Sequence, residues 1–154
     1  MPVDQPVDSV MMLIDRLGLQ PHLEGGWYRE IHRSTQSVSR EDGARRTALT
    51  VILFLLEADR PSRWHRVVGA DESWHFIDGA PVELLLCRDH DQPVASHRLG
   101  FGNGHPDLEP VRVVPAGWWQ AARSLGSWSL VSCCVGPGFD FADFVLDDGR
   151  PLPF

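Results

Sequence analysis

Two polar residues that lie close together in the chain, His65 and Glu72, have the side chains needed for proton transfer. Histidine is a base near neutral pH, and a carboxylate beside it can orient the ring. Side chains alternate between the two faces of a strand, so His65 and Glu72 on successive strands can face one interior, with His75 on the opposite face. Gln120 follows a turn that contains proline and glycine. His65, Glu72 and Gln120 are therefore predicted to line one pocket.

Aromatic residues are expected around these polar groups. Tyr28, the only tyrosine in the chain, follows a Glu-Gly-Gly sequence whose glycines allow a close approach of the backbone. A phenol can donate a proton or hold a ligand hydroxyl, although a tyrosine in a core or an interface is equally ordinary. Trp74 and Trp118 have the inward parity expected of the pocket. They are predicted either to form stacking walls for a planar or sugar ligand or to belong to the core.

One helix and a series of strands must position these side chains. Apolar residues from Val7 to Leu17, including Met11, recur at helical spacing, which predicts a helix that Asp8 caps and Gly18 ends. After it, short segments rich in Val, Leu, Phe, Trp and Thr alternate with turns marked by Gly, Pro and Asp. Strands are predicted at Trp27–Arg33, Thr47–Glu57, Arg63–Val68, Glu72–Asp78, Val82–Arg88, Ala95–Leu99, Val111–Val114, Gln120–Ala122, Ser127–Val135 and Phe141–Leu146.

Many short strands with one helix predict an all-β sandwich or barrel. The chain has 154 residues, a length typical of one domain, and no repeat or low-complexity linker divides it. We therefore expect a single domain over residues 1–154, with its core at about residues 10–146. Residues 89–110 are expected to form a long surface loop around one strand, with a turn at 100–104, and residues 147–154 to form a tail.

The composition argues against several classes of function. All 14 basic residues are arginine, so Schiff-base chemistry and a phosphate-loop lysine are excluded. The net charge is −7 and no arginine cluster exceeds a pair, which argues against a nucleic-acid partner. The three cysteines contain no CxxC pair, which argues against a cysteine zinc site. The longest near-apolar run, residues 48–56, is too short to span a bilayer, and no signal peptide is visible, so we expect a cytoplasmic protein without a membrane partner.

Four longer sequence strings, in order along the chain, carry a family resemblance. They are PHLEGGWYRE at 21–30, SRWHR at 62–66, VPAGWWQ at 114–120 and PGFDFADF at 137–144. In addition, His65, Glu72 and Gly79 match the spacing of the first cupin motif, and Pro115 and Gly117 match that of the second. Over about residues 10–146 the chain resembles the fifth cupin domain family, a family of unknown function. The resemblance implies a double-stranded β-helix, or jelly roll, commonly a dimer, with a small-molecule pocket inside the barrel.

The chain departs from the usual cupin metal site. A typical metal cupin offers three histidines and one glutamate to a divalent ion, whereas the corresponding residues here are His65, Val67, Glu72 and Gln120. Val67 has no donor atom, and the carbonyl oxygen of Gln120 is a weak ligand for late transition metals. We therefore expect no tightly bound metal cofactor. If a divalent metal is bound, His65, Glu72 and Gln120 are its candidate ligands; otherwise they form a hydrogen-bonded cluster on the pocket wall.

Three functions stay open at this point. By analogy with cupin-fold sugar-nucleotide epimerases, His65 is a base oriented by Glu72, and Tyr28 is the acid, in an isomerase that acts on a small polar metabolite without a tight metal. The second function is a non-catalytic barrel that senses or stores a small ligand. The third is a metal-dependent dioxygenase or lyase that uses Gln120 as a ligand. We favour a binding pocket with isomerase-like activity.

Further expectations concern assembly and the segments at both ends of the domain. A homodimer is expected through strand 27–33, because an N-terminal strand is free to pair across a two-fold axis. His22, in a turn, is expected to be solvated or to cap the backbone. Aromatic and acidic residues that alternate near the C-terminus are expected to form a structural lock without a chemical role: Phe139, Asp140, Phe141, Asp143 and Phe144.

Overall fold

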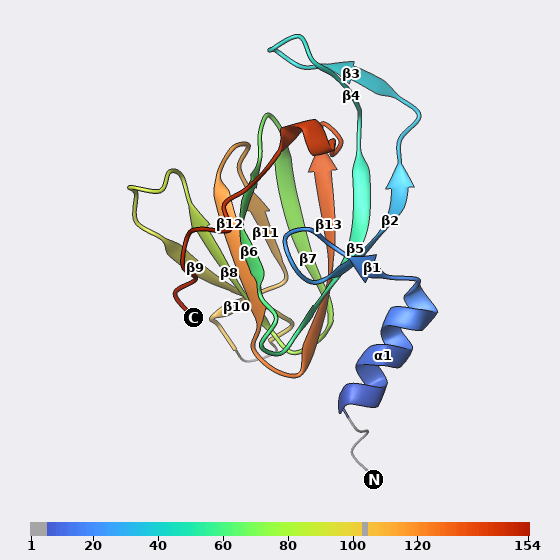
Figure 1. The fold of residues 1–154 in the computed structure, drawn as a ribbon, viewed down its shortest axis with the longest axis vertical. Coiled ribbons are helices and arrows are strands. Elements are labelled where there is room, and N and C mark those ends of the chain that lie inside the picture. Colours follow the sequence, from blue (N-terminus) through green and yellow to red (C-terminus); the bar gives the residue numbers. More distant parts are fainter. Residues whose placement is uncertain (1–5, 103–104) are drawn as a thin grey trace.

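Two six-stranded β-sheets face each other in the computed structural model, which describes residues 6–102 and 105–154 (Figure 1). One helix, α1 (Pro6–Leu17), lies beside the first sheet. The predicted all-β jelly roll with one N-terminal helix is therefore confirmed. The turn predicted at 100–104 lies partly outside the described residues. No helix in the described part of the chain is long and apolar enough to cross a membrane.

The first sheet forms one wall of the barrel, and all its neighbouring strands are antiparallel. Its strands, in order across the sheet, are β1 (Gln20–Pro21), β2 (Trp27–Arg33), β5 (Thr50–Glu57), β13 (Trp128–Gly136), β7 (Asp71–Gly79) and β11 (Val111–Val114). The strand that carries Glu72, β7, thus lies near one edge, and the strand that carries Tyr28, β2, lies near the other.

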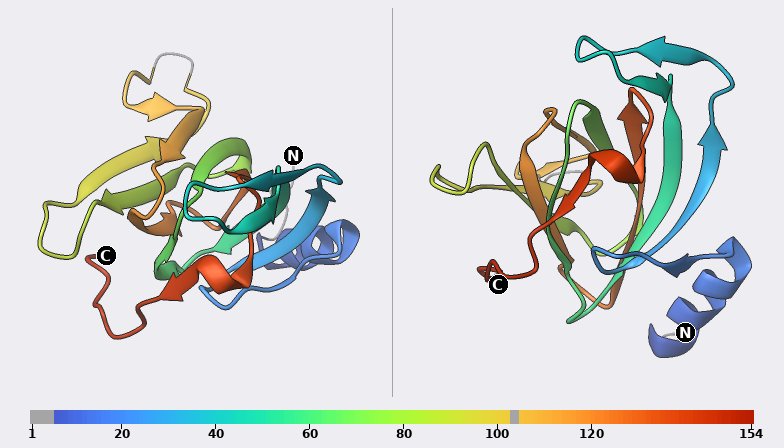
Figure 2. Two further views of the ribbon diagram at one scale, coloured as in Figure 1. Left: turned by 90° about the horizontal axis from the view of Figure 1, so that it is seen from above. Right: turned by 45° about the horizontal axis from the view of Figure 1, so that its top comes forward.

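The second sheet forms the opposite wall. Its strands, in order, are β10 (Leu108–Glu109), β9 (Ala95–Leu99), β8 (Val82–Cys87), β12 (Trp119–Ser124), β6 (Ser62–Val67) and β14 (Phe144–Leu146). A short 3-10 helix, η1 (Phe141–Asp143), leads into β14. A separate hairpin, β3 (Ser37–Ser39) and β4 (Arg45–Thr47), projects beyond one end of the two sheets (Figure 2).

Alternating side chains fill the space between the sheets unevenly. On β5, Phe54 and Leu56 belong to the closely packed apolar core. Thr50 and Ile52 lie on the same face nearer the start of the strand, and they line a cavity. On β7, Trp74 belongs to the same core, whereas Glu72 faces the cavity. One end of the barrel is therefore solid, and the other end is hollow and polar.

Helix α1 covers part of the outer face of the first sheet. Val10, Leu13 and Ile14 on the helix pack against Leu55 and Leu130 on the sheet. Burial of this apolar surface stabilises the fold at roughly 25 cal/mol per Å². The helical spacing therefore predicted the right element, and the right face for Val10 and Ile14, whereas Leu13 was not among the residues predicted on that face.

Both helix ends and one apolar residue refine that prediction. The helix begins at Pro6, so Asp8 lies in the first turn and not at the cap position. It ends before Gly18, whose φ of +65° favours glycine. Met11, predicted on the buried face, is 58% exposed.

Several strand boundaries differ from the prediction. The predicted strand Thr47–Glu57 is divided, because β4 ends at Thr47 and β5 begins at Thr50. Four strands of two or three residues, β1, β3, β4 and β10, were too short to show alternation. The predicted tail 147–154 packs on the outer face of the second sheet, where Nε1 of Trp64 donates to the carbonyl oxygen of Pro151 at 3.2 Å.

Candidate functional site

A cavity of about 350 Å³ lies at the polar end of the barrel. Tyr28 on β2 and Glu72 on β7 line it from the first sheet, and His65 on β6 lines it from the second sheet. The structure thus brings three predicted site residues from three strands to one space. The volume is typical of a pocket for a small metabolite.

His65 is held by hydrogen-bond acceptors on both ring nitrogens. Its Nε2 lies 2.6 Å from Oε2 of Glu24, and its Nδ1 donates to the carbonyl oxygen of Arg63 at 2.7 Å. Burial alone would lower the pKa of His65, but the charge of Glu24 and the hydrogen bond to it raise that pKa instead. Burial would raise the pKa of Glu24, but the charge of His65 lowers it. The two side chains therefore form an imidazolium–carboxylate pair.

The loop between β1 and β2 brings Glu24 to this position. Gly25 in that loop has a φ of +107°, a conformation that favours glycine. A Cβ at Gly25 would lie 2.6 Å from the carbonyl oxygen of Pro61, so a larger residue would push the loop away from β6. The backbone N–H of Arg63 donates to the carbonyl oxygen of Glu24 at 2.7 Å and fixes the loop against the strand.

The assignment of Glu72 as the carboxylate that orients His65 is wrong. Strand parity correctly places Glu72 in the same interior, but the side chain that bonds the His65 ring is Glu24, from a loop. The available signal was the Glu-Gly-Gly sequence itself. A carboxylate directly before two glycines lies where the backbone can come closest to its neighbours.

Glu72 is held by a chain of hydrogen bonds that begins at Trp74. Nε1 of Trp74 donates to Oε1 of Gln120 at 2.8 Å, and Nε2 of Gln120 donates to Oε1 of Glu72 at 2.7 Å. An indole N–H can only donate, so the amide of Gln120 must turn its amino group towards Glu72. Burial, together with the negative charge of Glu24, raises the pKa of Glu72 to about 7. Glu72 therefore exchanges its proton near neutral pH.

The three residues predicted to contact the ligand lie away from the cavity wall. Gln120 and Trp74 are each 1% exposed and form a layer behind Glu72. Trp118 packs against the apolar core. The geometry gives Gln120 and Trp74 a positioning role, whereas direct contact of Trp74 or Trp118 with a ligand stays a prediction.

Three wall residues were not predicted as part of the site. His22, expected to be solvated or to cap the backbone, is buried and accepts a hydrogen bond at Nδ1 from the backbone N–H of Glu24 at 3.1 Å. Burial lowers the pKa of His22. The centroid of its ring lies 4.6 Å from the ring centroid of Tyr28. Glu30 and Arg33 pair with each other through hydrogen bonds of 2.7 and 2.9 Å.

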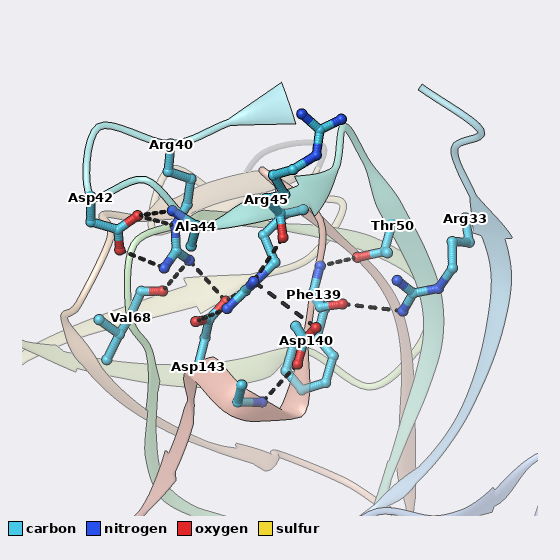
Figure 3. A network of polar contacts seen from close by, with 12 residues as sticks. Arg33, Arg40, Asp42, Ala44, Arg45, Thr50, Val68, Phe139, Asp140 and Asp143 are labelled. Carbon is cyan, nitrogen blue, oxygen red and sulfur yellow. Dashed lines mark hydrogen bonds and ion pairs between the residues drawn. The ribbon is translucent and has the colours of Figure 1, made fainter. Parts of the chain in front are cut away.

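The predicted lock near the C-terminus forms another side of the cavity. Phe139, Phe141 and Phe144 all line it, so the lock also shapes the site. The backbone of Phe139 is fixed from the first sheet, because its N–H donates to Oγ1 of Thr50 at 2.9 Å and its carbonyl oxygen accepts from Nη2 of Arg33 at 3.1 Å (Figure 3).

Two arginines tie this segment to the projecting hairpin. Asp143 in η1 accepts from Nη1 of Arg40 at 2.8 Å, and from Nε and Nη2 of Arg46 at 2.9 and 2.8 Å (Figure 3). These hydrogen bonds, led by those from Arg46, lower the pKa of Asp143. We call residues 137–144 the lid segment. Charged side chains anchor this segment where its three phenylalanine rings line the cavity.

The donor atoms at the cupin metal positions do not fit a metal ion. Gln120 turns its amide nitrogen towards Glu72, Val67 has no donor, and both nitrogens of His65 are bonded to acceptors. Within residues 6–102 and 105–154, no group of three or more His, Cys, Asp or Glu residues is placed to hold a metal ion. We therefore derive no chemical step from a metal.

Comparisons with known proteins agree with this architecture. Among solved structures, a hypothetical protein from Leishmania major is 34% identical, with a TM-score of 0.81 over 89% of this chain and 86% of that one. Protein SO0799 from Shewanella oneidensis is 31% identical, with a TM-score of 0.78 over 88% and 82% of the two chains. The uncharacterized protein YML079W of Saccharomyces cerevisiae is 27% identical over 165 residues, which cover 97% of this chain and 80% of that protein.

A family model covers the whole site. The model described as "Cupin superfamily (DUF985)" matches residues 11–147, and every wall residue discussed above lies within that range. The fold, the cavity and the two solved relatives above 30% identity all agree with this match. The chain therefore belongs to the DUF985 family of the cupin superfamily.

Proposed function

We propose that this protein binds a small polar metabolite in the cavity and transfers a proton there, as an isomerase-like enzyme that needs no tightly bound metal. The observation that carries the proposal is a carboxyl group with a pKa of about 7, Glu72, on the wall of a cavity of about 350 Å³. Removal of a proton beside a carbonyl group needs a base whose pKa lies near the working pH. Glu72 has that property.

The roles of the site residues follow from their partners. His65 is already protonated and both of its ring nitrogens donate, to Glu24 and to the carbonyl oxygen of Arg63, so it has no free lone pair and Glu72 takes the part of the base. His65, through its pair with Glu24, holds a carboxylate charge beside Glu72, and that charge contributes to the raised pKa of Glu72. Tyr28, on the same wall, can donate its hydroxyl hydrogen to a ligand oxygen.

A non-catalytic sensor or storage protein is the second candidate. It is favoured by the closed pairing of His65, which removes the base predicted from sequence. A metal-dependent dioxygenase or lyase is the least supported, because the oxygen of Gln120 is engaged by Trp74. Ligand binding in the cavity is common to the first two candidates, and turnover distinguishes them.

Hydrogen exchange tests the proposal directly. Wild-type protein is incubated in deuterium oxide with a panel of small hydroxy- and amino-carbonyl compounds, and loss of the proton beside the carbonyl is followed by NMR. We expect exchange of at least one compound, with a rate that falls about 10²–10⁴-fold in Glu72→Gln. The control Glu83→Gln alters a glutamate on β8 that bonds Arg123 outside the cavity, and it should keep the wild-type rate.

Two outcomes would contradict the proposed roles. Equal exchange rates in Glu72→Gln and Glu83→Gln would exclude Glu72 as the base. Compounds that raise the melting temperature of the wild type but show no exchange above buffer would favour the non-catalytic candidate.

A further inference from the structure

The charges of the cavity wall identify a class of ligand. The charged side chains of the wall are Glu24, Glu30, Arg33, His65, Glu72 and Asp140. The wall also contains His22, which lies beside Glu24 and whose pKa is lowered by burial. Both positive groups are already neutralised, because Arg33 bonds Glu30 through two hydrogen bonds and His65 bonds Glu24. Within the described wall, a phosphate or carboxylate ligand would therefore meet no cation without a carboxylate partner. A ligand that brings positive charge would meet the carboxyl group of Glu72, whereas Asp140 already lies 4.0 Å from Nε of Arg46.

The hydrogen-bonding groups point the same way. The N–H groups of the His65 ring are directed at Glu24 and at the carbonyl oxygen of Arg63. The amino group of Gln120 is directed at Glu72 and lies behind the wall. On this side of the wall Glu72 therefore presents acceptor oxygens, which N–H donors of a ligand complement, while Tyr28 supplies a hydroxyl elsewhere on the wall.

The apolar part of the wall is aromatic. The ring centroids of Phe139 and Phe141 are 4.9 Å apart, and those of Phe141 and Phe144 are 6.2 Å apart, both at steep angles. Phe141 is 53% exposed, so its ring is open to a partner. Aromatic faces attract cations through their quadrupoles as well as packing against apolar groups.

We propose that the cavity binds a small organic ammonium ion, with its N–H groups at the Glu72 carboxylate and its apolar body against the rings of the lid segment. This inference rests on the proposed function, because it requires that the cavity is the binding site. It extends that function by naming the ligand class, and it argues against an anionic ligand such as a sugar nucleotide, on which the epimerases of the sequence analogy act.

Binding of such a cation is linked to the proton on Glu72. The groups that face Glu72 are Glu24 from the β1–β2 loop, His65 from β6, Gln120 from β12 and Cys133 from β13. Burial and Glu24 favour the protonated form, and an ammonium ion would favour the carboxylate. Association at or below neutral pH should therefore release a proton, and affinity should rise with pH up to about 8.

Three probes of nearly equal shape separate charge from packing. Cyclohexylammonium, cyclohexanol and cyclohexanecarboxylate are titrated into the full-length protein by calorimetry at about pH 8 and about pH 6. We expect cyclohexylammonium to bind at least about tenfold more tightly than cyclohexanol at the higher pH, and the carboxylate to bind more weakly than both. Repetition in buffers of different ionisation enthalpy measures the released proton.

Matched variants assign the effect to its residues. Glu72→Gln should bring the affinity for cyclohexylammonium to within about threefold of that for cyclohexanol and abolish proton release. Glu83→Gln should keep both the wild-type difference in affinity between cyclohexylammonium and cyclohexanol and the wild-type proton release. Phe141→Leu keeps an apolar side chain at the open side of the cavity, and it should weaken the ammonium probe more than the alcohol.

Each contrary result has a distinct meaning. Equal affinity for cyclohexanol and cyclohexylammonium, or tighter binding of the carboxylate, would overturn the ammonium inference and leave the proposed binding function in place. Failure of all three probes to bind the wild-type protein would count against both the ammonium inference and the proposed binding function. Tight ammonium binding that Glu72→Gln does not weaken would show that the cation lies elsewhere and would also overturn the inference.

Discussion

Nε2 of His65 lies 2.6 Å from Oε2 of Glu24, and this contact joins a loop beside the first sheet to a strand of the second. The two side chains are only 3% and 8% exposed. Removal of one member of a buried ion pair leaves the other charge without a partner. The pair therefore both fixes the loop between β1 and β2 and balances charge on the cavity wall.

The first prediction concerns this pair. Glu24→Gln should destabilise the protein by about 3–5 kcal/mol, because the imidazolium loses its counter-charge in a buried position. The pKa of His65 should fall below its ordinary value, since burial then dominates. Denaturant unfolding measures the first effect, and NMR titration of the His65 ring protons measures the second. An unchanged pKa for His65 would show that Glu24 does not hold its proton.

The second prediction concerns the pH dependence of stability. The pKa of Glu72 is raised from 4.5 to about 7 in the folded state, so the folded protein binds this proton more tightly than the unfolded chain. The stabilisation is complete below about pH 4.5 and is lost as pH rises through about 7, with a total of about 3 kcal/mol. Glu72→Gln should remove this part of the pH slope.

Paired unfolding curves provide the measurement. The free energy of unfolding of wild type and Glu72→Gln is compared at about pH 5 and about pH 8. The free energy of unfolding of Glu72→Gln, relative to that of the wild type, should be larger at about pH 8 than at about pH 5. For Glu83→Gln the pH dependence of the free energy of unfolding should match that of the wild type. Identical slopes in wild type and Glu72→Gln would place the pKa of Glu72 near that of an ordinary carboxyl group.

The sequence was informative where local periodicity decides position. Alternation along β6 and β7 placed His65 and Glu72 on the inner face, and the same rule placed His75 on the outer face, where it bonds Ser73. The spacing of apolar residues placed helix α1. These features depend on the geometry of single elements, which a sequence shows directly.

The sequence was uninformative where contacts join distant segments. Glu24 reaches His65 only because the loop folds against β6, and no periodicity records that approach. The orientation of Gln120 depends on which partner its amide oxygen meets. That partner is Trp74, for which the sequence left a place in the pocket wall and a place in the core both open. The role of Phe141 in the cavity wall likewise depends on anchors from the β3–β4 hairpin, whose strands were too short to predict.

The third prediction tests the positioning role of Trp74. Trp74→Phe removes the N–H that fixes the amide of Gln120, so the hydrogen bond from Gln120 to Glu72, which now lowers the pKa of Glu72, should weaken. That pKa should therefore rise above its present value of about 7. NMR of the Glu72 side-chain carbonyl carbon reports it. Trp64→Phe removes a comparable hydrogen bond from an indole N–H outside the cavity, and it should leave the pKa of Glu72 unchanged. Equal shifts of that pKa in both variants would contradict the positioning role of Trp74.

The fourth prediction concerns assembly through β2. In the described structure β1 pairs only with Trp27 and Tyr28, so the outer edge of β2 from Arg29 to Arg33 has no strand partner. Open edges pair readily with another strand, and Ile31 on this edge is 50% exposed. We expect a homodimer of about twice the 17.2 kDa chain mass by light scattering. Ile31→Asp should shift the protein from dimer to monomer. Val94→Asp, at another exposed position, should leave the dimer intact. A wild-type protein that is a monomer by light scattering would refute the prediction.

The fifth prediction concerns the anchor of the lid segment. Asp143 accepts three hydrogen bonds from Arg40 and Arg46, and Asp143→Asn retains a single acceptor oxygen and no charge. The backbone amides of residues 137–144 should then exchange with solvent roughly tenfold faster, because local opening loses fewer charge-assisted bonds. The change should be visible by hydrogen–deuterium exchange mass spectrometry at a temperature where the protein remains folded.

Asp42 provides the matched control for this anchor. It bonds the same guanidinium of Arg40 at 3.1 and 2.6 Å, but it lies within the hairpin and makes no hydrogen bond to residues 137–144 in the described structure. Asp42→Asn should therefore leave exchange in the lid segment at the wild-type rate. Because Phe139, Phe141 and Phe144 depend on the anchor for their place at the cavity, Asp143→Asn should also weaken cyclohexylammonium binding, whereas Asp42→Asn should not. Equal exchange rates in the two variants would show that Asp143 does not hold the wall of the site.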